Sequence, residues 1–304
     1  MSSPVVELKN VTKVIKGKKI IDDLSFTIEE GEVFGFLGPN GAGKTTTIRM
    51  MVGLMGISSG EILICGKNVK KEFEDALQNI GGIVENPELY KFLTGYQNLM
   101  QYARMVKGIS KQKIDEVVEF VGLKDRIHDK VKTYSLGMRQ RLGLAQSLLH
   151  DPKVMILDEP TNGLDPAGIR EIRDHLKKLT KEKGMSVIVS SHLLSEMEMM
   201  CDRIAIIQNG RLVDIQKVHD YVQESKQKYF FEVEMKNIAS LQTSGIDFEK
   251  VENGIEIEME KDEVPNMIQL LIEKGIRIFE VKPISKTLED RFIEVTTQGE
   301  KLHA

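Results

Sequence analysis

Short apolar runs near the start of the chain predict strands. Residues 5–11 (VVELKNV) alternate apolar and polar side chains, and residues 33–37 (VFGFL) form a continuous apolar run. A glycine-rich segment follows directly, and beyond it apolar residues recur at helical spacing: Ile48, Met51, Val52 and Met55. The predicted order is therefore strand, glycine-rich loop, helix.

Helical patterns dominate from about residue 87 to 148. Thr94 and Gln97 have the spacing of a capping box, and an apolar stripe follows at Ile114, Val117, Val118 and Val121. Strands and helices then alternate again: VMIL (154–157), a helix opened by Asp165-Pro166, SVIVS (186–190) and RIAIIQ (203–208). This alternation predicts a largely parallel sheet covered by helices, with the helical block as an insertion.

The last part of the chain has a different pattern and is predicted to be a separate unit. Ile255, Ile257 and Met259 alternate with glutamates just after an Asn253-Gly254 turn. A helix is expected near 263–274 and a strand (IRIFEV) after it, which together suggest a small split βαβ sheet with helices on one face.

The predicted domains are residues 1–222, an α/β domain with a helical subdomain at about 87–148, and residues 223–304, a small α+β domain. A final helix is expected near residues 287–295, with Leu288, Phe292 and Val295 on one face. The second domain is interpreted either as a regulatory or dimerising domain or as a lid that stabilises the first.

Composition narrows the class of protein. The chain has 304 residues, 41% of them hydrophobic, and a formal net charge of -4. No apolar stretch approaches the length of a membrane span and the start lacks the apolar core of a signal peptide, so a cytosolic chain is expected. The near-neutral charge disfavours a nucleic-acid partner. Cys65 and Cys201 lie far apart and are expected to be buried free thiols.

The glycine-rich segment carries the first candidate chemistry. Residues 38–45 match G-x-x-x-x-G-K-[ST], a pattern in which glycines let backbone N–H groups converge on phosphate oxygens. Lys44 is expected to reach the β and γ phosphates and Thr45 to ligate magnesium. The candidate phosphate-binding residues are Gly38, Pro39, Asn40, Gly41, Ala42, Gly43, Lys44, Thr45 and Thr46.

Two adjacent acids end the apolar strand at 154–157. Asp158 and Glu159 are expected at the carboxyl edge of the sheet, beside the phosphate loop. Alone, a strand ending in two acids is more often a solvated loop. Downstream of a phosphate loop, Asp158 is expected to hold magnesium through water and Glu159 to polarise an attacking water as general base.

Three further segments complete a family pattern. Residues 133–141 (TYSLGMRQR) resemble the LSGGQ signature of ABC ATPases, residues 162–165 (NGLD) resemble the D-loop, and His192 resembles the switch histidine. The resemblance covers about residues 5–215. It implies a P-loop NTPase of ABC type, with an antiparallel β subdomain beside the helical one, which binds ATP and Mg²⁺ and hydrolyses ATP.

The same resemblance implies partners and a location. In ABC ATPases two copies pack head to tail, so that ATP lies between the phosphate loop of one copy and the signature of the other. Ser135 and Gly137 are therefore expected to face the partner's γ-phosphate, and His192 the γ-phosphate of its own site. Separate transmembrane permease subunits would hold the chain peripherally on the inner face of the cell membrane.

Four residues, in three segments, depart from the family pattern. Ile15 stands where an aromatic residue usually stacks on adenine, so nucleotide discrimination is expected to be loose. Glu85 replaces the usual glutamine that contacts magnesium and water, as in ATPases of bacitracin and lantibiotic self-protection exporters; lineage drift without specificity is the alternative. Leu136 and Met138 replace glycine and glutamine in the signature, and an active but slow site is expected.

Several functions remain open at this point. The leading hypothesis is the ATPase subunit of an exporter of antimicrobial peptides, bacteriocins or drugs. The alternatives are a soluble ABC ATPase not coupled to transport, an importer or transporter of another substrate, and a regulatory ATP sensor without catalysis.

Overall fold

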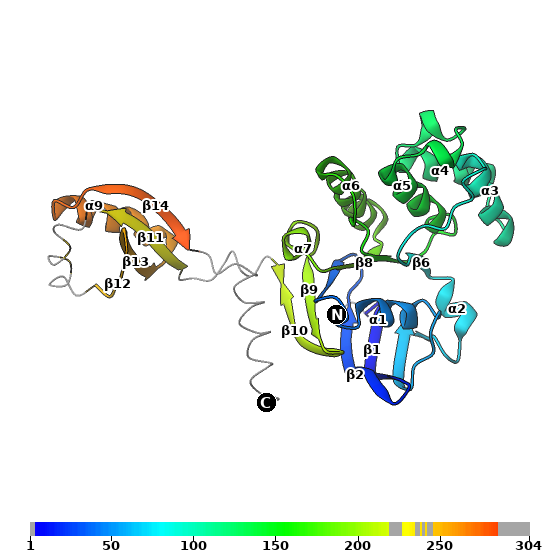
Figure 1. Ribbon diagram of the computed structural model, residues 1–304, viewed down its shortest axis with the longest axis horizontal. Coiled ribbons are helices and arrows are strands. Elements are labelled where there is room, and N and C mark those ends of the chain that lie inside the picture. Colours follow the sequence, from blue (N-terminus) through cyan, green and yellow to red (C-terminus); the bar gives the residue numbers. More distant parts are fainter. Residues whose placement is uncertain (1–3, 219–226, 235–237, 239–240, 242–245, 285–304) are drawn as a thin grey trace. The chain divides into compact units, whose positions relative to one another are not determined.

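The computed structural model describes residues 4–218, 227–234, 238, 241 and 246–284. Contacts between Cα atoms divide the chain into two compact units, Met1–Val218 and His219–Ala304 (Figure 1). Each unit has its own hydrophobic core.

The first unit contains an antiparallel sheet in the order β2-β1-β4-β5. Its longest strands are joined by a tight turn at Lys16 and Gly17, both with positive φ. The alternating pattern of residues 5–11 is thereby confirmed as strand. The strands are β1 (Val6–Ile15), β2 (Lys18–Ile28), β4 (Ser59–Ile64) and β5 (Lys67–Asn68).

A second sheet of the first unit has six strands in the order β10-β9-β3-β8-β7-β6. All neighbours are parallel except β10, which forms an antiparallel hairpin with β9. Every residue of the three central strands is buried, as continuous apolar runs predict for a sheet covered on both faces. The strands are β3 (Val33–Leu37), β6 (Ile80–Ile83), β7 (Val154–Asp158), β8 (Ser186–Ser191), β9 (Arg203–Gln208) and β10 (Arg211–Lys217).

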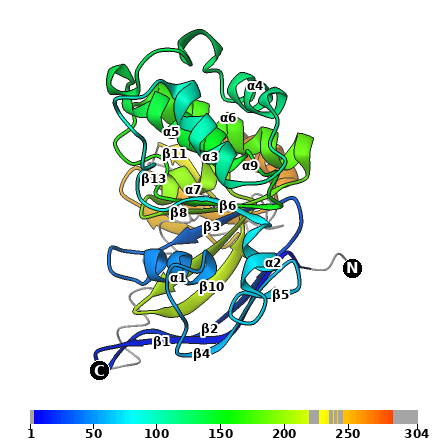
Figure 2. The same cartoon turned by 90° about the vertical axis from the view of Figure 1, so that its right-hand side faces the viewer.

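Helices cover both faces of the six-stranded sheet. Figure 2 shows α1 (Lys44–Met51) between the two sheets, and α6 (Pro166–Lys183) and α7 (Leu194–Met200) on the opposite face. Asp165 caps α6 through its side chain, and Pro166 occupies the first turn, as the sequence predicts. A short helix, α2 (Phe73–Leu77), leads into β6.

The helical block contains α3 (Gly95–Met105), α4 (Lys111–Phe120) and α5 (Leu136–Ser147), with the 3-10 turns η1 (Lys124–Arg126) and η2 (Val131–Thr133). Both hydrogen bonds of the predicted capping box of Thr94 and Gln97 are present. The predicted apolar stripe of α4 is buried, including Val121 just beyond its end. The helical insertion is therefore confirmed.

The second unit contains an antiparallel sheet in the order β12-β13-β11-β14. Since β13 and β14 are both antiparallel to β11, they run parallel to each other, and α9 connects them. This is the predicted split βαβ arrangement. The elements are β11 (Gln227–Val233), β12 (Glu249–Val251), β13 (Gly254–Met259), η5 (Lys261–Glu263), α9 (Val264–Glu273) and β14 (Ile278–Ile284).

Side-chain burial in this unit follows the alternation of the sequence. Ile255, Ile257 and Met259 are buried in its core, as predicted. The final helix predicted near residues 287–295 lies outside the described residues. Within the described ranges, no helix combines the length and the apolar character that crossing a membrane requires.

Candidate nucleotide site

The topology brings three of the predicted segments to one edge of the six-stranded sheet. Strands β3, β8 and β7 are parallel neighbours, with Leu37 paired to Ser191 and Asp158 paired to Ser190. The phosphate loop after β3, His192 after β8 and Glu159 after β7 therefore emerge side by side. The carboxyl edge of a parallel sheet is where such folds bind ligands.

The phosphate loop depends on glycine at its two ends. A Cβ on Gly38 would lie 2.3 Å from the carbonyl oxygen of Ile207, and one on Gly43 would lie 2.4 Å from Cδ1 of Ile21. Gly43 also has a φ of +109° and forms the N-cap of α1. A side chain on Gly38 would therefore displace backbone, and one on Gly43 would push the Ile21 side chain and strain the positive φ.

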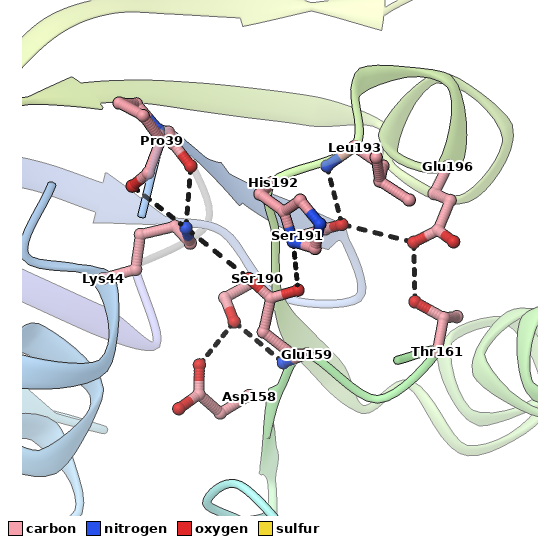
Figure 3. Close-up of polar contacts among 11 residues, drawn as sticks. Pro39, Lys44, Asp158, Glu159, Thr161, Ser190, Ser191, His192, Leu193 and Glu196 are labelled. Atoms are coloured by element: carbon pink, nitrogen blue, oxygen red, sulfur yellow. Dashed lines mark hydrogen bonds and ion pairs between the residues drawn. The ribbon is translucent and has the colours of Figure 1, made fainter. Parts of the chain in front are cut away.

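Lys44 is the first residue of α1 and is only 6% exposed. Its Nζ donates to the carbonyl oxygens of Gly38 at 2.7 Å and Pro39 at 3.4 Å, and lies 3.5 Å from Oε1 of Glu159 (Figure 3). The first N–H groups of a helix have no partner within it, and in α1 these include Lys44, Thr45 and Thr46. The loop thus combines a cation with backbone donors at a helix N-terminus, which suits an anion.

Ser190 holds the acidic pair in place. Its hydroxyl donates to Oδ1 of Asp158 at 2.6 Å and accepts from the backbone N–H of Glu159 at 2.9 Å (Figure 3). Asp158 is 2% exposed, and Glu159 takes a left-handed φ of +49° that turns the chain sharply after β7. Sequence reasoning did not single out Ser190, because an apolar strand usually ends in a polar residue for solvation alone.

Glu159 lies between two groups that can be positively charged. Its Oε2 is 2.9 Å from Nδ1 of His192, and its Oε1 faces Lys44 as described. The structure therefore brings Lys44, Glu159 and His192 together, as predicted from their places in the sequence. A carboxylate in this position can accept a proton from a water beside a bound anion.

The signature residues lie at the start of α5. Ser135 is its N-cap and its hydroxyl accepts from the N–H of Met138 at 3.2 Å. In the part of the chain that the structure describes, no hydrogen bond joins Ser135 or Gly137 to the phosphate loop of the same chain. Their predicted role toward a partner's nucleotide, and that of Ile15 at the end of β1 toward adenine, stay predictions.

Leu136 packs against the loop that resembles the D-loop. Its Cδ2 lies 3.2 Å from the position a Cβ would take on Gly163, and Cδ2 of Leu164 lies 3.8 Å from the corresponding position on Gly137. The leucine that departs from the family signature therefore contacts the D-loop-like segment of its own chain.

Glu85 forms an ion pair that the sequence did not predict. It takes a left-handed φ of +66°, and its Oε1 forms an ion pair with Nη2 of Arg49 on α1. Among the described residues no group of three acidic, histidine or cysteine side chains is placed to hold a metal ion. A metal role for Glu85 therefore stays a prediction. Arg49 was not anticipated, since nothing in the sequence links positions 49 and 85.

The Met-rich helix α7 buries residues of both apolar and acidic character. Met197 and Met200 are buried, but Met199 is half-exposed and Glu196 is buried beside them. Of the two cysteines, both free thiols, Cys201 is buried and Cys65 is only half-buried. Burial raises the pKa of both thiols.

Comparison with known proteins identifies the family. Residues 21–162 match the family model described as ABC transporter. The uncharacterized ABC transporter ATP-binding protein YhcH of Bacillus subtilis is 70% identical over 99% of both chains. The bacitracin transport ATP-binding protein BcrA of Bacillus licheniformis is 39% identical over 98% of this chain and 99% of its own. The lantibiotic transport ATP-binding protein SrtF of Streptococcus pyogenes is 39% identical over 71% of this chain and 92% of its own.

Solved structures agree with this similarity. The cbiO1 subunit of Clostridium perfringens, part of an ABC transporter complex, is 26% identical with a TM-score of 0.67 over 73% of this chain and 92% of its own. A dimeric ATP-binding cassette in a post-hydrolysis state, bound to ADP and Pi, is 26% identical with a TM-score of 0.64 over 70% of this chain and 99% of its own. Together with the phosphate loop and the acidic pair at one sheet edge, these similarities show that the chain belongs to the ABC transporter ATP-binding family and is a nucleotide-binding ATPase subunit of a transporter.

Proposed function

We propose that the chain powers an exporter of antimicrobial peptides, bacteriocins or related drugs and so contributes to resistance or self-immunity. The observation that carries this proposal is the similarity to BcrA, which extends over 98% of the chain and therefore includes the second unit. The shorter similarity to SrtF supports the same substrate class. Both relatives are named for peptide antibiotics.

The proposal gives each site residue a role. Residues 38–46 cradle the phosphates of ATP, with Lys44 as their cation, and Ile15 packs on the adenine. Glu159 is the general base that takes a proton from the attacking water. His192 holds Glu159 through the 2.9 Å contact and faces the γ-phosphate.

The oxygen donors fit a magnesium ion. Asp158 is a buried carboxylate and Thr45 a hydroxyl in the first turn of α1, and Mg²⁺ prefers few protein oxygens together with phosphate and water. When bound, the ion would neutralise charge on the phosphate oxygens. Glu85 is an additional candidate donor if it leaves Arg49.

The site is completed by a second copy. We assign Ser135 and Gly137 to the partner's nucleotide in a head-to-tail, ATP-dependent dimer. Both lie at a helix N-terminus, and among the described residues neither forms a hydrogen bond with its own phosphate loop. Membrane permease subunits are the other partners, and they hold the chain on the cytoplasmic face of the membrane. The residues 1–222 form the ATPase domain and 223–304 an accessory domain in this proposal.

Two linked experiments test the proposal. Affinity purification of the tagged chain from detergent-solubilised membranes should recover a permease subunit. Expression of the pair in a sensitive host should raise the inhibitory concentration of a bacitracin or lantibiotic, and the Glu159→Gln variant should abolish this protection. Recovery of ribosomes instead of a permease, or unchanged sensitivity across a peptide panel, would contradict it.

A further inference from the structure

Helix α7 carries a buried carboxylate that the mechanism above does not use. Glu196 is 7% exposed. Its Oε2 accepts hydrogen bonds from two hydroxyls, Oγ1 of Thr161 at 2.6 Å and Oγ of Ser191 at 3.2 Å (Figure 3). Within the described ranges, no lysine, arginine or histidine forms an ion pair with Glu196.

Packing alone does not explain a carboxylate at this position. Taking a carboxylate out of water is unfavourable unless hydrogen bonds or a counter-ion replace its hydration, and an apolar residue of similar size is often at least as stabilising. The neighbouring Met197 and Met200 are both buried, so an apolar side chain would suit the surroundings. The hydroxyls of Thr161 and Ser191, which both donate to Oε2, replace the water that Glu196 loses on burial.

The two hydroxyls belong to different functional loops. Thr161 opens the loop to α6 that contains the D-loop-like residues 162–165, of which Asn162, Gly163 and Asp165 are exposed. Ser191 ends β8 directly before His192, and its Oγ also accepts from the N–H of Leu193 at 3.0 Å. Oε2 of Glu196 therefore links the exposed loop that begins at Thr161 to the turn that contains His192.

We infer that Glu196 is a positioning residue: it couples the loop at 161–165 to His192, so that the position of this loop sets the contact between His192 and Glu159. Hydrogen bonds to a charged acceptor are short and strong, and a dry environment strengthens them further. The bond from Thr161 is short, at 2.6 Å, and the carboxylate that accepts it is buried. The inference rests on the proposed roles of Glu159 and His192 and adds the residue through which a docking second copy would reach them.

Substitution of Thr161 tests the link with little change of shape. Thr161→Val replaces the hydroxyl with a methyl group of similar size. The full-length chain should then hydrolyse ATP with a kcat about ten- to a hundred-fold lower, because a misplaced catalytic group costs that much. The KM for ATP should stay within about two-fold, since the phosphate loop is untouched. Thr161→Ser restores the hydroxyl and should restore most of the kcat. Glu198→Ala, an exposed carboxylate of the same helix, is the matched control.

A double-variant comparison shows whether the effect passes through His192. In a His192→Ala background, Thr161→Val should lower kcat no further, because the group that it positions is gone. A kcat unaffected by Thr161→Val, or lowered by the same factor with and without His192, would overturn the inference. If His192→Ala itself leaves kcat unchanged, the proposed role of His192 is wrong as well. This result distinguishes failure of the proposed site from failure of the Glu196 link alone. Ser191→Ala provides a second route to the same link if Thr161→Val does not fold.

Discussion

The Ser190→Ala variant should lose both stability and turnover. Ser190 is fully buried, and its hydroxyl bridges the carboxylate of Asp158 at 2.6 Å and the N–H of Glu159 at 2.9 Å. A hydrogen bond to a charged group contributes about 1.5–3 kcal/mol and a neutral one about 1 kcal/mol. Alanine removes one oxygen atom and leaves both partners in place, so we expect the free energy of unfolding to fall by about 2.5–4 kcal/mol.

The effect on hydrolysis is separate from the effect on stability. Without the bridge, the backbone at Glu159 is no longer held to β8, and a shift of about 1 Å in a catalytic group lowers kcat roughly a hundred-fold. Urea unfolding followed by circular dichroism measures the first effect, and steady-state ATP hydrolysis below the unfolding transition measures the second. Ser195→Ala, at an exposed serine of α7, is the control. This account of the acidic pair would be refuted if Ser190→Ala had the same free energy of unfolding as the parent chain and a kcat within about two-fold of it.

Three further outcomes are expected. Arg49→Gln should change the free energy of unfolding by less than about 1 kcal/mol, because the ion pair of Arg49 with Glu85 is largely exposed. The variant frees Glu85, which should alter the Mg²⁺ concentration that half-saturates ATP binding. An unaltered concentration would show that Glu85 is not part of the metal site. The Cys201 thiol should react with a disulfide reagent at pH 8 only on unfolding, because burial raises its pKa and the thiolate is the reactive form; fast labelling of native protein would contradict its burial. Ile15→Tyr should strengthen ATP binding and widen the preference for ATP over GTP in a binding titration, whereas unchanged affinities would place the adenine elsewhere.

The sequence predicts the framework of this protein well because its signals are local. Continuous apolar runs identify the buried strands that end at Leu37 and Asp158, and the capping pattern at Thr94 and the Asp165-Pro166 start identify helices. The phosphate loop is also local, since its glycines are required by close backbone approaches such as that of Gly38 to the Ile207 carbonyl.

The contacts that tune the site are not local and could not be read in the same way. Glu85 pairs with Arg49, and Glu196 binds Thr161, across 36 and 35 positions of sequence. A glutamate in a methionine-rich helix is normally predicted to face solvent, yet Glu196 is buried. In the sequence, Leu136 is only a departure from the family signature. The fold shows that it packs against Gly163.

We propose that Glu159, held by Ser190 and His192 beside the phosphate loop, is the general base of ATP hydrolysis. The most direct test of this claim is single-turnover ATP hydrolysis by the Glu159→Gln variant, with ATP affinity measured on the same sample. We expect hydrolysis to fall by at least about a hundred-fold while ATP still binds. Hydrolysis at the parent rate with normal ATP affinity would contradict the claim.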